Sequence, residues 1–439
     1  MSKGCAFLMD MGTGKTITTI AVAGTLFHKH KITRMLVVCP KSIVDVWEQE
    51  FEKFATFDYQ LAVLDGSSAK KADTIRYMIG TGLQVIVVNY ESCWRLEAEL
   101  TRWHPDMIAC DESSKIKNPQ AKCSKALHRL GKISSYNLIL TGTPITNSPL
   151  DFFSQYKFLD EKIFGSSFYS FRAYYAILGG YQNHQIVGYK HLAELVEKAH
   201  SIAYRIRIDE AVDLPEFVEE MRMVKLDRNA QKIYDGIEKD SFAELMNGEI
   251  TTRNVLTSLL RLSQVTGGFV RNDAGDASQQ VSLAKLEALE EIIDDCLDAG
   301  KKVVVFARFI PEINAICKML RSNHIRYSHI YGAVKDRSKQ VEQFQTDPQT
   351  KVFVGQLQTT GMGLTLTAGS VCVYYSLDFS YANYQQSMAR VRRIGQTKRV
   401  VYIHLVCKDT IDEKVMSALK QKADVSKLLV DDYKKIIGG

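Results

Sequence analysis

Residues 9–16 of the chain combine the residue types that bind phosphate groups. This segment reads MDMGTGKT. Gly12 and Gly14 allow a tight turn that aims successive backbone N–H groups at one point, and Lys15 can place its ammonium on the outer phosphates. The hydroxyl of Thr16 can bind Mg²⁺ at the same place. This chemistry predicts a site for a nucleoside triphosphate and its magnesium ion.

The elements around this loop decide between a phosphate site and an ordinary glycine-rich turn. An apolar run at 5–8 predicts a buried strand, and residues 17–27 predict a helix rich in Ala, Thr and Ile. Strand, loop and helix N-terminus therefore come in the order that phosphate binding requires. Thr13 completes the loop, although Met9 stands where the strict pattern has glycine. We favour the phosphate site because its flanking elements are correct.

An adjacent acidic pair, Asp111 and Glu112, has the chemistry to complete such a site. The pair follows the apolar run 107–110, so it would lie where the carboxyl end of a parallel strand opens toward a ligand. Asp111 is suited to holding Mg²⁺ through water, and Glu112 to orienting and deprotonating the attacking water. Alone, the pair would also suit an acidic helix N-cap. Because a phosphate loop is also present, we favour a catalytic role for the acidic pair.

Two later segments add hydroxyl groups and cations. Residues 140–144, LTGTP, follow another expected strand and could sense the nucleotide, although alone they suit an ordinary turn. Residues 385–396, QQSMARVRRIGQ, place Arg390 and Arg393 three positions apart, which predicts one shared helix face. From a second lobe, this pair could neutralise charge that develops on the γ-phosphate, as arginine fingers do. The alternative is a solvated basic face.

Length and composition limit the class of protein. A chain of 439 residues with 46% hydrophobic and 24% charged residues is long enough for two domains or more. It has no apolar run long enough to span a bilayer and no signal peptide, so we expect a cytoplasmic protein. Its nine cysteines lack metal-binding spacing, which predicts reduced thiols without zinc or disulfides. The net charge of +6 is compatible with a polyanionic partner.

Short apolar runs alternate with helical patterns along most of the chain. This alternation predicts an α/β fold with doubly wound parallel sheets. The expected strands are 35–39, 85–88, 107–110 and 137–140 in a first series, and 303–306, 327–331, 351–354, 371–375 and 400–406 in a second. The clearest helices of the second series are 311–320 and 411–419.

A polar, turn-rich stretch near residue 275 separates the two series. We therefore expect an ATP-binding lobe over 1–225, a helical bridge and linker over 226–275, and a second lobe over 276–439. The first lobe would include a helical insertion at about 152–200. Helices are expected between the two series at 152–158, 168–177, 190–199, 229–246 and 251–265.

Several segments resemble the Snf2 family of superfamily 2 DNA-dependent ATPases, in the family's order and across nearly the whole chain. They are MDMGTGKT at 9–16, VVCPKSIVDVWEQEFEKF at 37–54, VVNYES at 87–92, DESSKIKN at 111–118, LTGTPITNSPLDFFSQ at 140–155, KVVVFARF at 302–309, QTTGMGLTLTAG at 358–369 and ARVRRIGQT at 389–397. This resemblance implies two RecA-like, P-loop lobes that bind ATP and Mg²⁺ between them.

The resemblance also implies a role for each matching residue. Catalysis would involve Lys15, the Walker B pair Asp111 and Glu112, Gln386, and the arginine fingers Arg390 and Arg393. ATP would bind Gly12, Thr13, Gly14, Lys15, Thr16 and Gly363, and Mg²⁺ would bind Thr16 and Asp111. The nucleic-acid track would include Pro40, Lys41, Asn89, Tyr90, Arg308, Thr359 and Thr360.

Three features depart from the family pattern. Ser113 and Ser114 stand where the family usually has a residue followed by His, so the link from hydrolysis to the 141–144 segment would run through hydroxyls. Arg392 replaces a common His between the two fingers. Only eight residues precede Met9, which leaves no room for the upstream helix and Gln that usually read adenine. We expect a chain shortened at its start, the alternative being relaxed nucleotide selectivity.

The function implied is ATP-driven translocation on double-stranded DNA, and DNA rather than RNA is implied by the resemblance alone. Phosphate contacts position a protein on DNA without reading bases, which suits such tracking. We expect a monomer without a membrane partner, with a replication or repair protein as a partner, in a bacterium or a phage-infected cell.

Three alternatives stay open. The first is a strand-separating or annealing superfamily 2 enzyme of replication, recombination or repair, which shares the same motifs. The second is an ATP-binding nucleic-acid clamp with negligible turnover, although it would have no chemical need for Lys15, Glu112, Arg390 and Arg393 together. The third, an ATP-dependent enzyme of small-molecule metabolism, is the poorest because no segment suggests a separate substrate site.

Overall fold

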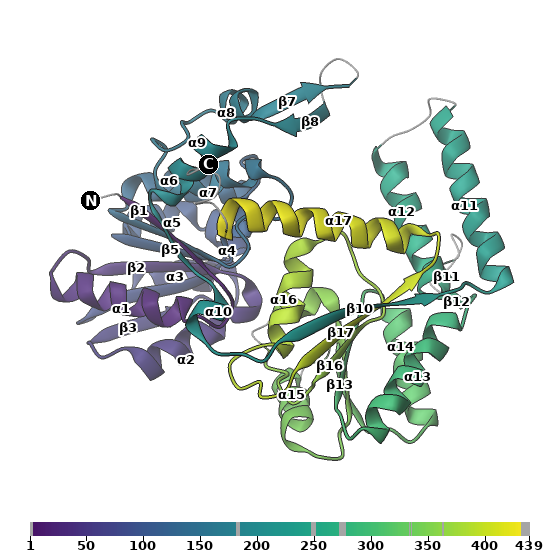
Figure 1. The fold of residues 1–439 in the computed structure, drawn as a ribbon. Coiled ribbons are helices and arrows are strands. Elements are labelled where there is room, and N and C mark those ends of the chain that lie inside the picture. The colour runs from purple at the N-terminus through teal and green to yellow at the C-terminus, as the bar shows by residue number, and fades with distance from the viewer. Residues whose placement is uncertain are drawn as a thin grey trace. The chain divides into compact units, whose positions relative to one another are not determined.

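Parallel β-strands form the centre of two units in the computed structural model (Figure 1). The structure describes residues 3–180, 185–246, 252–271, 278–332, 334, 336–361 and 364–431. The first unit comprises residues 1–213 and 422–439, and the second comprises residues 214–421. In the described part of the chain, no helix has both the length and the apolar composition that crossing a membrane requires.

The first unit contains a seven-stranded parallel sheet with the order β3-β4-β2-β5-β6-β1-β9. Its strands are β1 (Gly4–Met9), β2 (Arg34–Cys39), β3 (Tyr59–Val63), β4 (Leu83–Asn89), β5 (Met107–Asp111), β6 (Tyr136–Thr141) and β9 (Ala203–Ile206). The central strands are apolar at successive positions because helices cover both faces of the sheet. Met35 and Val37 pack in one apolar cluster, whereas Leu36 and Val38 pack in another.

Helices of the first unit divide between these two clusters. One face of the sheet is covered by α1 (Lys15–His28) and α2 (Val44–Phe54), which bury Ile20 and Trp47 there. The other face is covered by α4 (Tyr90–Arg95), α5 (Glu97–Trp103), α6 (Lys122–Ile133) and α7 (Phe152–Leu159). A short α3 (Ser68–Arg76) and α10 (Ile208–Ala211) also belong to this unit. The expected doubly wound arrangement is confirmed.

The second unit contains a six-stranded parallel sheet with the order β10-β17-β16-β13-β15-β14. Its strands are β10 (Phe217–Val224), β13 (Val303–Ala307), β14 (Tyr327–Ile330), β15 (Val352–Gln356), β16 (Val371–Tyr374) and β17 (Val400–Cys407). Its helices include α13 (Ala284–Asp298), α14 (Ile310–Ser322), α15 (Arg337–Thr346), α16 (Tyr381–Val391) and α17 (Ile411–Ser426), which begins in this unit. Every expected strand of the second series is present.

Strand pairing places the division between the units earlier than the expected change at residue 225. The whole of β10 pairs with β17, from Phe217 opposite Val400 to Val224 opposite Cys407, so it belongs to the second sheet. Its sequence FVEEMRMV contains charged residues because it is an edge strand, and a search for apolar runs misses it. Residues 226–271 also group with the second unit, including α11 (Arg228–Met246) and α12 (Thr252–Thr266).

The insertion expected to be helical at 152–200 also contains strands. The helix expected over 168–177 ends earlier, because α8 (Phe168–Tyr175) is followed directly by β7 (Ala176–Gly179). This strand pairs antiparallel with β8 (Gln185–Tyr189) in a hairpin visible beside α8 and α9 (Leu192–His200) (Figure 1). A second hairpin in the other unit joins β11 (Phe269–Arg271) to β12 (Ser278–Gln280). These strands are too short for periodicity to reveal them.

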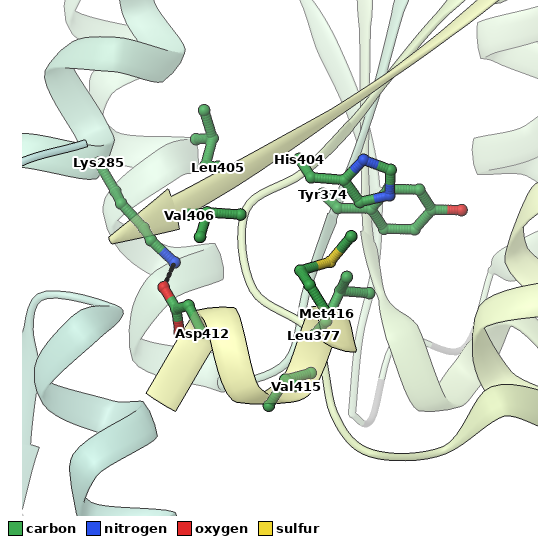
Figure 2. A pocket seen from close by; sticks show the side chains of 9 residues that line it. All are labelled: Lys285, Tyr374, Leu377, His404, Leu405, Val406, Asp412, Val415 and Met416. Atoms are coloured by element: carbon green, nitrogen blue, oxygen red, sulfur yellow. Dashed lines mark ion pairs between the residues drawn. The ribbon is translucent and has the colours of Figure 1, made fainter. Parts of the chain in front are cut away.

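A buried ion pair joins two helices of the second unit. Lys285 of α13 is 3% exposed, and its Nζ lies 2.7 Å from Oδ2 of Asp412 on α17. The same ammonium donates a hydrogen bond of 3.0 Å to the carbonyl of Tyr375. Figure 2 shows this pair beside a cavity of about 10 Å³, which has room for about one water molecule. Burial works against the charge on Lys285, but the Asp412 carboxylate outweighs it and raises the pKa of the lysine.

Removal of Lys285 tests how much the second unit depends on this pair. Lys285→Met keeps the length of the side chain but leaves the partly buried Asp412 carboxylate without its cation. We expect the free energy of unfolding of the second unit to fall by about 3–5 kcal/mol in urea denaturation of the full chain. The matched control is Arg222→Ala, which breaks an exposed pair with Glu291 and should cost about 0–1 kcal/mol. Equal losses in both variants would contradict a special role for the buried pair.

Candidate functional site

The phosphate loop joins β1 to α1 through glycines in the left-handed region. Gly12 has φ 84° and Gly14 has φ 91°. Residues with a side chain adopt such backbone conformations only at an energetic cost. Gly14 is the N-cap of α1, so the free N–H groups of the first helical turn lie directly after it. Lys15 Nζ donates hydrogen bonds of 2.9 Å to the carbonyl of Met9 and 3.1 Å to that of Asp10. The loop therefore concentrates positive charge at the helix N-terminus.

An arginine that the sequence did not single out fixes the start of this loop. Arg205 of β9 forms an ion pair of 2.7 Å with Oδ1 of Asp10 and donates a hydrogen bond of 2.9 Å to the carbonyl of Leu8. Its Nε donates a further bond of 2.8 Å to Asp431, in the C-terminal segment of the same unit. About 200 residues separate Arg205 from Asp10. No local pattern links them, so sequence reasoning had no signal for this contact.

The residues expected to hold Mg²⁺ have the oxygens to do so. The hydroxyls of Thr18 and Thr19 donate to the carbonyls of Gly14 and Lys15. No hydrogen bond engages the hydroxyl of Thr16 among the described residues, so this oxygen is available to a ligand. Asp111 supplies a carboxylate, a group that suits magnesium. The described residues contain no cluster of three or more His, Cys, Asp or Glu that could hold a metal alone.

Asp111 ends β5 and is tightly held. Its Oδ2 accepts a hydrogen bond of 3.1 Å from Nε1 of Trp47 on α2, and its Oδ1 accepts one of 3.0 Å from the N–H of Glu112. Burial and the neighbouring Glu112 carboxylate raise the pKa of Asp111 to about 6, while Lys15 and the Trp47 hydrogen bond act in the opposite direction. Because the charge of Lys15 reaches Asp111, the phosphate loop and the acidic pair belong to one electrostatic site.

Glu112 has an unusual backbone and an unpaired side-chain oxygen. Its φ and ψ are 52° and 54°, in the left-handed region that residues other than glycine seldom occupy. Its Oε2 is buried and has no hydrogen-bond partner in the described part of the chain. A buried carboxylate oxygen with no partner is costly, and strained backbone of this kind is common at active sites. This oxygen is therefore available to accept a hydrogen bond from a water molecule.

The residue after this pair is linked to the 141–144 segment. Ser113 Oγ donates a hydrogen bond of 2.7 Å to Oε1 of Gln155, whose Nε2 donates one of 2.8 Å to the carbonyl of Pro144. The link expected to run through hydroxyls thus uses Ser113, but it also needs the amide of Gln155 in α7. A polar residue in the apolar run FFSQYKFL was the available signal. A Cβ added at Gly142 would lie 3.2 Å from the carbonyl of Met9, so this segment also packs closely on the phosphate loop.

Of the nucleic-acid residues expected in the first unit, two are exposed to some degree and two are used internally. Pro40 and Lys41 follow β2, and Lys41 is exposed. Asn89 is 8% exposed and caps α4, because its side chain accepts the N–H of Ser92. Tyr90 is 3% exposed and donates a hydrogen bond of 2.7 Å to the carbonyl of Asp111. This placement favours Lys41, rather than Asn89 or Tyr90, for direct contact with a phosphate.

The expected arginine fingers lie at the end of α16, but they do not share a helix. The prediction of one helix face for Arg390 and Arg393 is wrong, because α16 ends at Val391 and only Arg390 lies within it. Gln396 holds the chain in a turn by donating from Nε2 to the carbonyls of Thr367, Gly369 and Val391. Within this turn, Arg393 donates a hydrogen bond of 3.2 Å to the hydroxyl of Thr365.

Aromatic residues of the second sheet fix the position of α16, which also contains Gln386. The hydroxyl of Tyr374 lies 2.8 Å from Oγ of Ser387, and that of Tyr384 lies 3.0 Å from Nε2 of His404. The rings of Tyr374 and His404 stack with centroids 5.0 Å apart, as Figure 2 shows. Burial lowers the pKa of His404 to about 4, so this histidine is neutral at physiological pH.

Arg392, which stands where His is common in similar sequences, has a structural role. Its Nε donates a hydrogen bond of 3.1 Å to the carbonyl of Pro215, and its guanidinium lies 5.1 Å from the ring centroid of Phe217 at the start of β10. Cation–π contacts of this kind stabilise a packed edge. Arg392 therefore attaches the turn after α16 to the edge strand of the second sheet.

The remaining nucleic-acid residues follow strands of the second sheet. Arg308 comes directly after β13 and lines a cavity of about 660 Å³, with its guanidinium 4.8 Å from the ring centroid of Phe309. Thr359 lies in a short 3₁₀ turn after β15 and donates to the carbonyl of Gln356. Thr360 lies in the same turn. Gly363, expected to bind ATP, lies outside the described residues.

Comparisons with known proteins identify two sequence families in this chain. A family model of the SNF2-related domain matches residues 1–267, and one of the helicase conserved C-terminal domain matches residues 284–395. A solved structure of the Sulfolobus solfataricus SWI2/SNF2 ATPase core in complex with dsDNA is 26% identical, with a TM-score of 0.44, and the match covers 99% of this chain and 92% of that one.

Three curated relatives match almost the whole chain. The chicken (Gallus gallus) "DNA repair and recombination protein RAD54-like" is 28% identical, over 99% of this chain and 65% of that protein. An uncharacterized ATP-dependent helicase of Mycoplasma genitalium is 25% identical, over 96% of this chain and 40% of its own length. The ISWI chromatin-remodeling complex ATPase ISW1 of Saccharomyces cerevisiae is 26% identical, over 96% of this chain and 38% of that protein. The chain thus spans less than two thirds of each relative.

The pKa of Asp111 gives a pH dependence that distinguishes this site. Because that carboxyl has a pKa of about 6, protons would compete with the expected magnesium ion below this pH, and we expect ATP hydrolysis to fall as the pH drops through about 6. Trp47→Phe removes a hydrogen bond that lowers this pKa. The acid limb of the pH–rate profile, where the rate falls as the pH drops, should therefore move to higher pH. The measurement is kcat/KM for Mg·ATP between pH 5 and pH 8.

A matched tryptophan provides the control. Trp103 is also buried, but it lies in the other apolar cluster of the first unit, and its Nε1 has no partner among the described residues. Trp103→Phe should therefore leave the acid limb where the unchanged protein has it. An acid limb at the same pH in Trp47→Phe and in the unchanged protein would contradict the assignment to Asp111.

Proposed function

The chain belongs to the SNF2-related family, and we propose that it hydrolyses ATP and uses the energy to translocate along double-stranded DNA. The observation that best supports hydrolysis is the unpaired, buried oxygen of Glu112, held in a strained conformation beside Asp111 and the phosphate loop. A carboxylate in this position can activate water. Its relatives named as ATP-dependent helicase and ATPase support the same chemistry.

In the proposed reaction, the N–H groups that follow Gly14 and the ammonium of Lys15 bind the phosphates. Thr16 and Asp111 would hold Mg²⁺, which would supply positive charge to the phosphate oxygens. Glu112 accepts a proton from the attacking water while the water oxygen bonds to the γ-phosphorus and the bond to the β–γ bridging oxygen breaks. ADP and inorganic phosphate are the products.

We propose that Arg390 and Arg393, which belong to the second unit, act on the γ-phosphate. Guanidinium groups neutralise charge that develops on a transferred phosphoryl group. The hydrogen bond from Arg393 to Thr365 and the turn fixed by Gln396 hold the second arginine on a defined backbone. ATP would then draw the two units together, and release of phosphate and ADP would allow them to separate, which couples hydrolysis to movement.

DNA is the proposed track because of the relatives and of the residues at the strand ends. Relatives are named for DNA repair and recombination and for chromatin remodeling. Lys41 and Arg308 follow the carboxyl ends of β2 and β13, the edge at which parallel sheets bind ligands. Cations at these ends can bind phosphates of any sequence. We also propose a replication or repair protein as a partner, in keeping with the RAD54-like relative.

Replacement of Glu112 by glutamine separates ATP binding from hydrolysis. Glu112→Gln keeps the size of the side chain but removes the base, so we expect hydrolysis to fall by about 10²–10⁴-fold, with ATP affinity retained. ATPase rates are measured without nucleic acid and with single-stranded DNA, duplex DNA or RNA. We expect the strongest stimulation of the unchanged protein by duplex DNA.

The exposed residue Glu48 of α2 supplies the matched control, since Glu48→Gln makes the same chemical change away from the site. This control should keep the rate of the unchanged protein. Equal rates in Glu112→Gln and the control would contradict the proposed base. Absence of stimulation by every nucleic acid would instead favour an ATP-binding clamp or a different substrate.

Strand displacement distinguishes a duplex translocase from a strand-separating enzyme, which has the same motifs. A translocase that holds the phosphates of a duplex should displace the third strand of a DNA triplex in the presence of ATP and leave the duplex paired. Both reactions are followed by gel electrophoresis, with Glu112→Gln as the inactive control. Unwinding of the duplex without triplex displacement would overturn translocation in favour of strand separation.

A further inference from the structure

Gln155 is a fully buried polar residue in a helix whose neighbouring residues are mostly apolar. It lies in α7, within the sequence FFSQYKFL, and has 0% exposure. A buried side-chain amide is costly unless its hydrogen bonds are satisfied. In Gln155 the carbonyl accepts from Ser113, and the amide nitrogen donates 2.8 Å to the carbonyl of Pro144 and 2.9 Å to that of Asp151.

These bonds fix the direction of the amide. The two backbone carbonyls can only accept, so Nε2 must face them and Oε1 must face the hydroxyl of Ser113. Ser113 is itself 0% exposed and comes directly after Glu112. Gln155 therefore connects the residue next to the proposed base with the end of the 141–144 segment, through bonds that an apolar side chain cannot make.

A second connection joins the same two segments at their other ends. The ammonium of Lys117 donates to the hydroxyl of Thr146. The carboxylate of Asp151 accepts from the backbone N–H groups of Thr146 (2.9 Å) and Asn147 (2.8 Å). Residues 113–117 and 144–147 are thus held together by a buried bond at one end and a partly exposed bond at the other. A shift of one segment must move the other.

The outer end of this assembly is suited to respond to a polyanion. Lys117 is partly exposed and adds a cation to the 144–147 segment, and phosphates are attracted to such cations. The inner end approaches the phosphate loop, because Gly142 packs against the carbonyl of Met9. A phosphate bound at Lys117 can therefore act on the 144–147 segment through Thr146, and Gln155 connects that segment to Ser113 beside Glu112.

We propose that Gln155 is a positioning residue that transmits DNA binding at the 144–147 segment to Glu112, so that DNA stimulates hydrolysis. This inference rests on the proposed function of a DNA-dependent ATPase. Gln155 does not contact the reacting atoms in this role. It keeps Ser113, and through it the adjacent Glu112, in register with the 141–147 segment.

Gln155→Leu tests the proposal, because leucine fills similar volume without making the three hydrogen bonds. We expect the rate without DNA, and KM for ATP, to stay within about twofold of the unchanged protein. The DNA-stimulated kcat should fall by about tenfold to a hundredfold, the size of effect that misplaced catalytic groups produce. The affinity for a duplex should be retained in a fluorescence anisotropy titration.

Ser124→Ala is the matched control. Ser124 is also fully buried and donates to the carbonyl of Ile116 in the segment after Glu112, but this bond does not reach residues 144–147. The control should keep its DNA stimulation even if its melting temperature falls. Loss of stimulation in both variants would overturn the specific role of Gln155 and indicate a general structural effect.

Ser113→Ala keeps the proposal testable if leucine at 155 prevents folding. It removes only the hydroxyl and should also reduce the DNA-stimulated rate. In the double variant the two losses should not add, because both remove the same connection. Full stimulation of a folded Gln155→Leu or Ser113→Ala protein would overturn the proposal. If DNA does not stimulate the unchanged protein, the proposed function itself fails, and this inference fails with it.

Discussion

The close approach of the buried acidic pair to the phosphate loop is the constraint on which the first unit depends. Two adjacent carboxylates at the end of a central strand repel each other, and burial increases the cost of their charge. Trp47 and the N–H of Glu112 bind the Asp111 carboxylate, and the charge of Lys15 reaches it. The neighbouring elements α1, α2 and β5 must therefore keep their spacing, and the strain at Glu112 is stored where the chemistry takes place.

In the second unit, a different set of contacts positions the residues expected to bind phosphate. It must hold α16 and the following turn so that two arginines have defined positions. Neutral groups hold the helix itself: tyrosine hydroxyls bind Ser387 and His404, and the burial that lowers the pKa of His404 keeps the ring uncharged. The second unit also holds the charged pair Lys285–Asp412, in which each partner compensates the other. A neutral support for α16 adds no charge to compete with its arginines for phosphate.

Local patterns in the sequence predicted the fold wherever a strand is buried on both faces. Runs such as 35–39 and 303–306 are continuously apolar, and both are strands. The edge strand β10 and the hairpin of β7 and β8 have mixed or short sequences, so the boundary at 225 and the helix at 168–177 differ from the structure. The spacing of Arg390 and Arg393 suggested one helix because nothing local marks the bonds of Gln396 that end it. Likewise, Arg205 and Gln155 act on segments that only the tertiary fold brings near.

The Ser113–Gln155 contact links the residue after the acidic pair to the 141–144 segment. A serine hydroxyl is short, so it can reach the 141–144 segment only if another side chain extends toward it. Gln155 provides that extension from α7. Its amide oxygen accepts from Ser113, and its amide nitrogen donates to the backbone carbonyls of Pro144 and Asp151. Replacing either residue alone leaves a partner unpaired in the core, which costs more stability than the bond contributes. The link at Ser113 therefore depends on two residues that lie 42 positions apart in the chain.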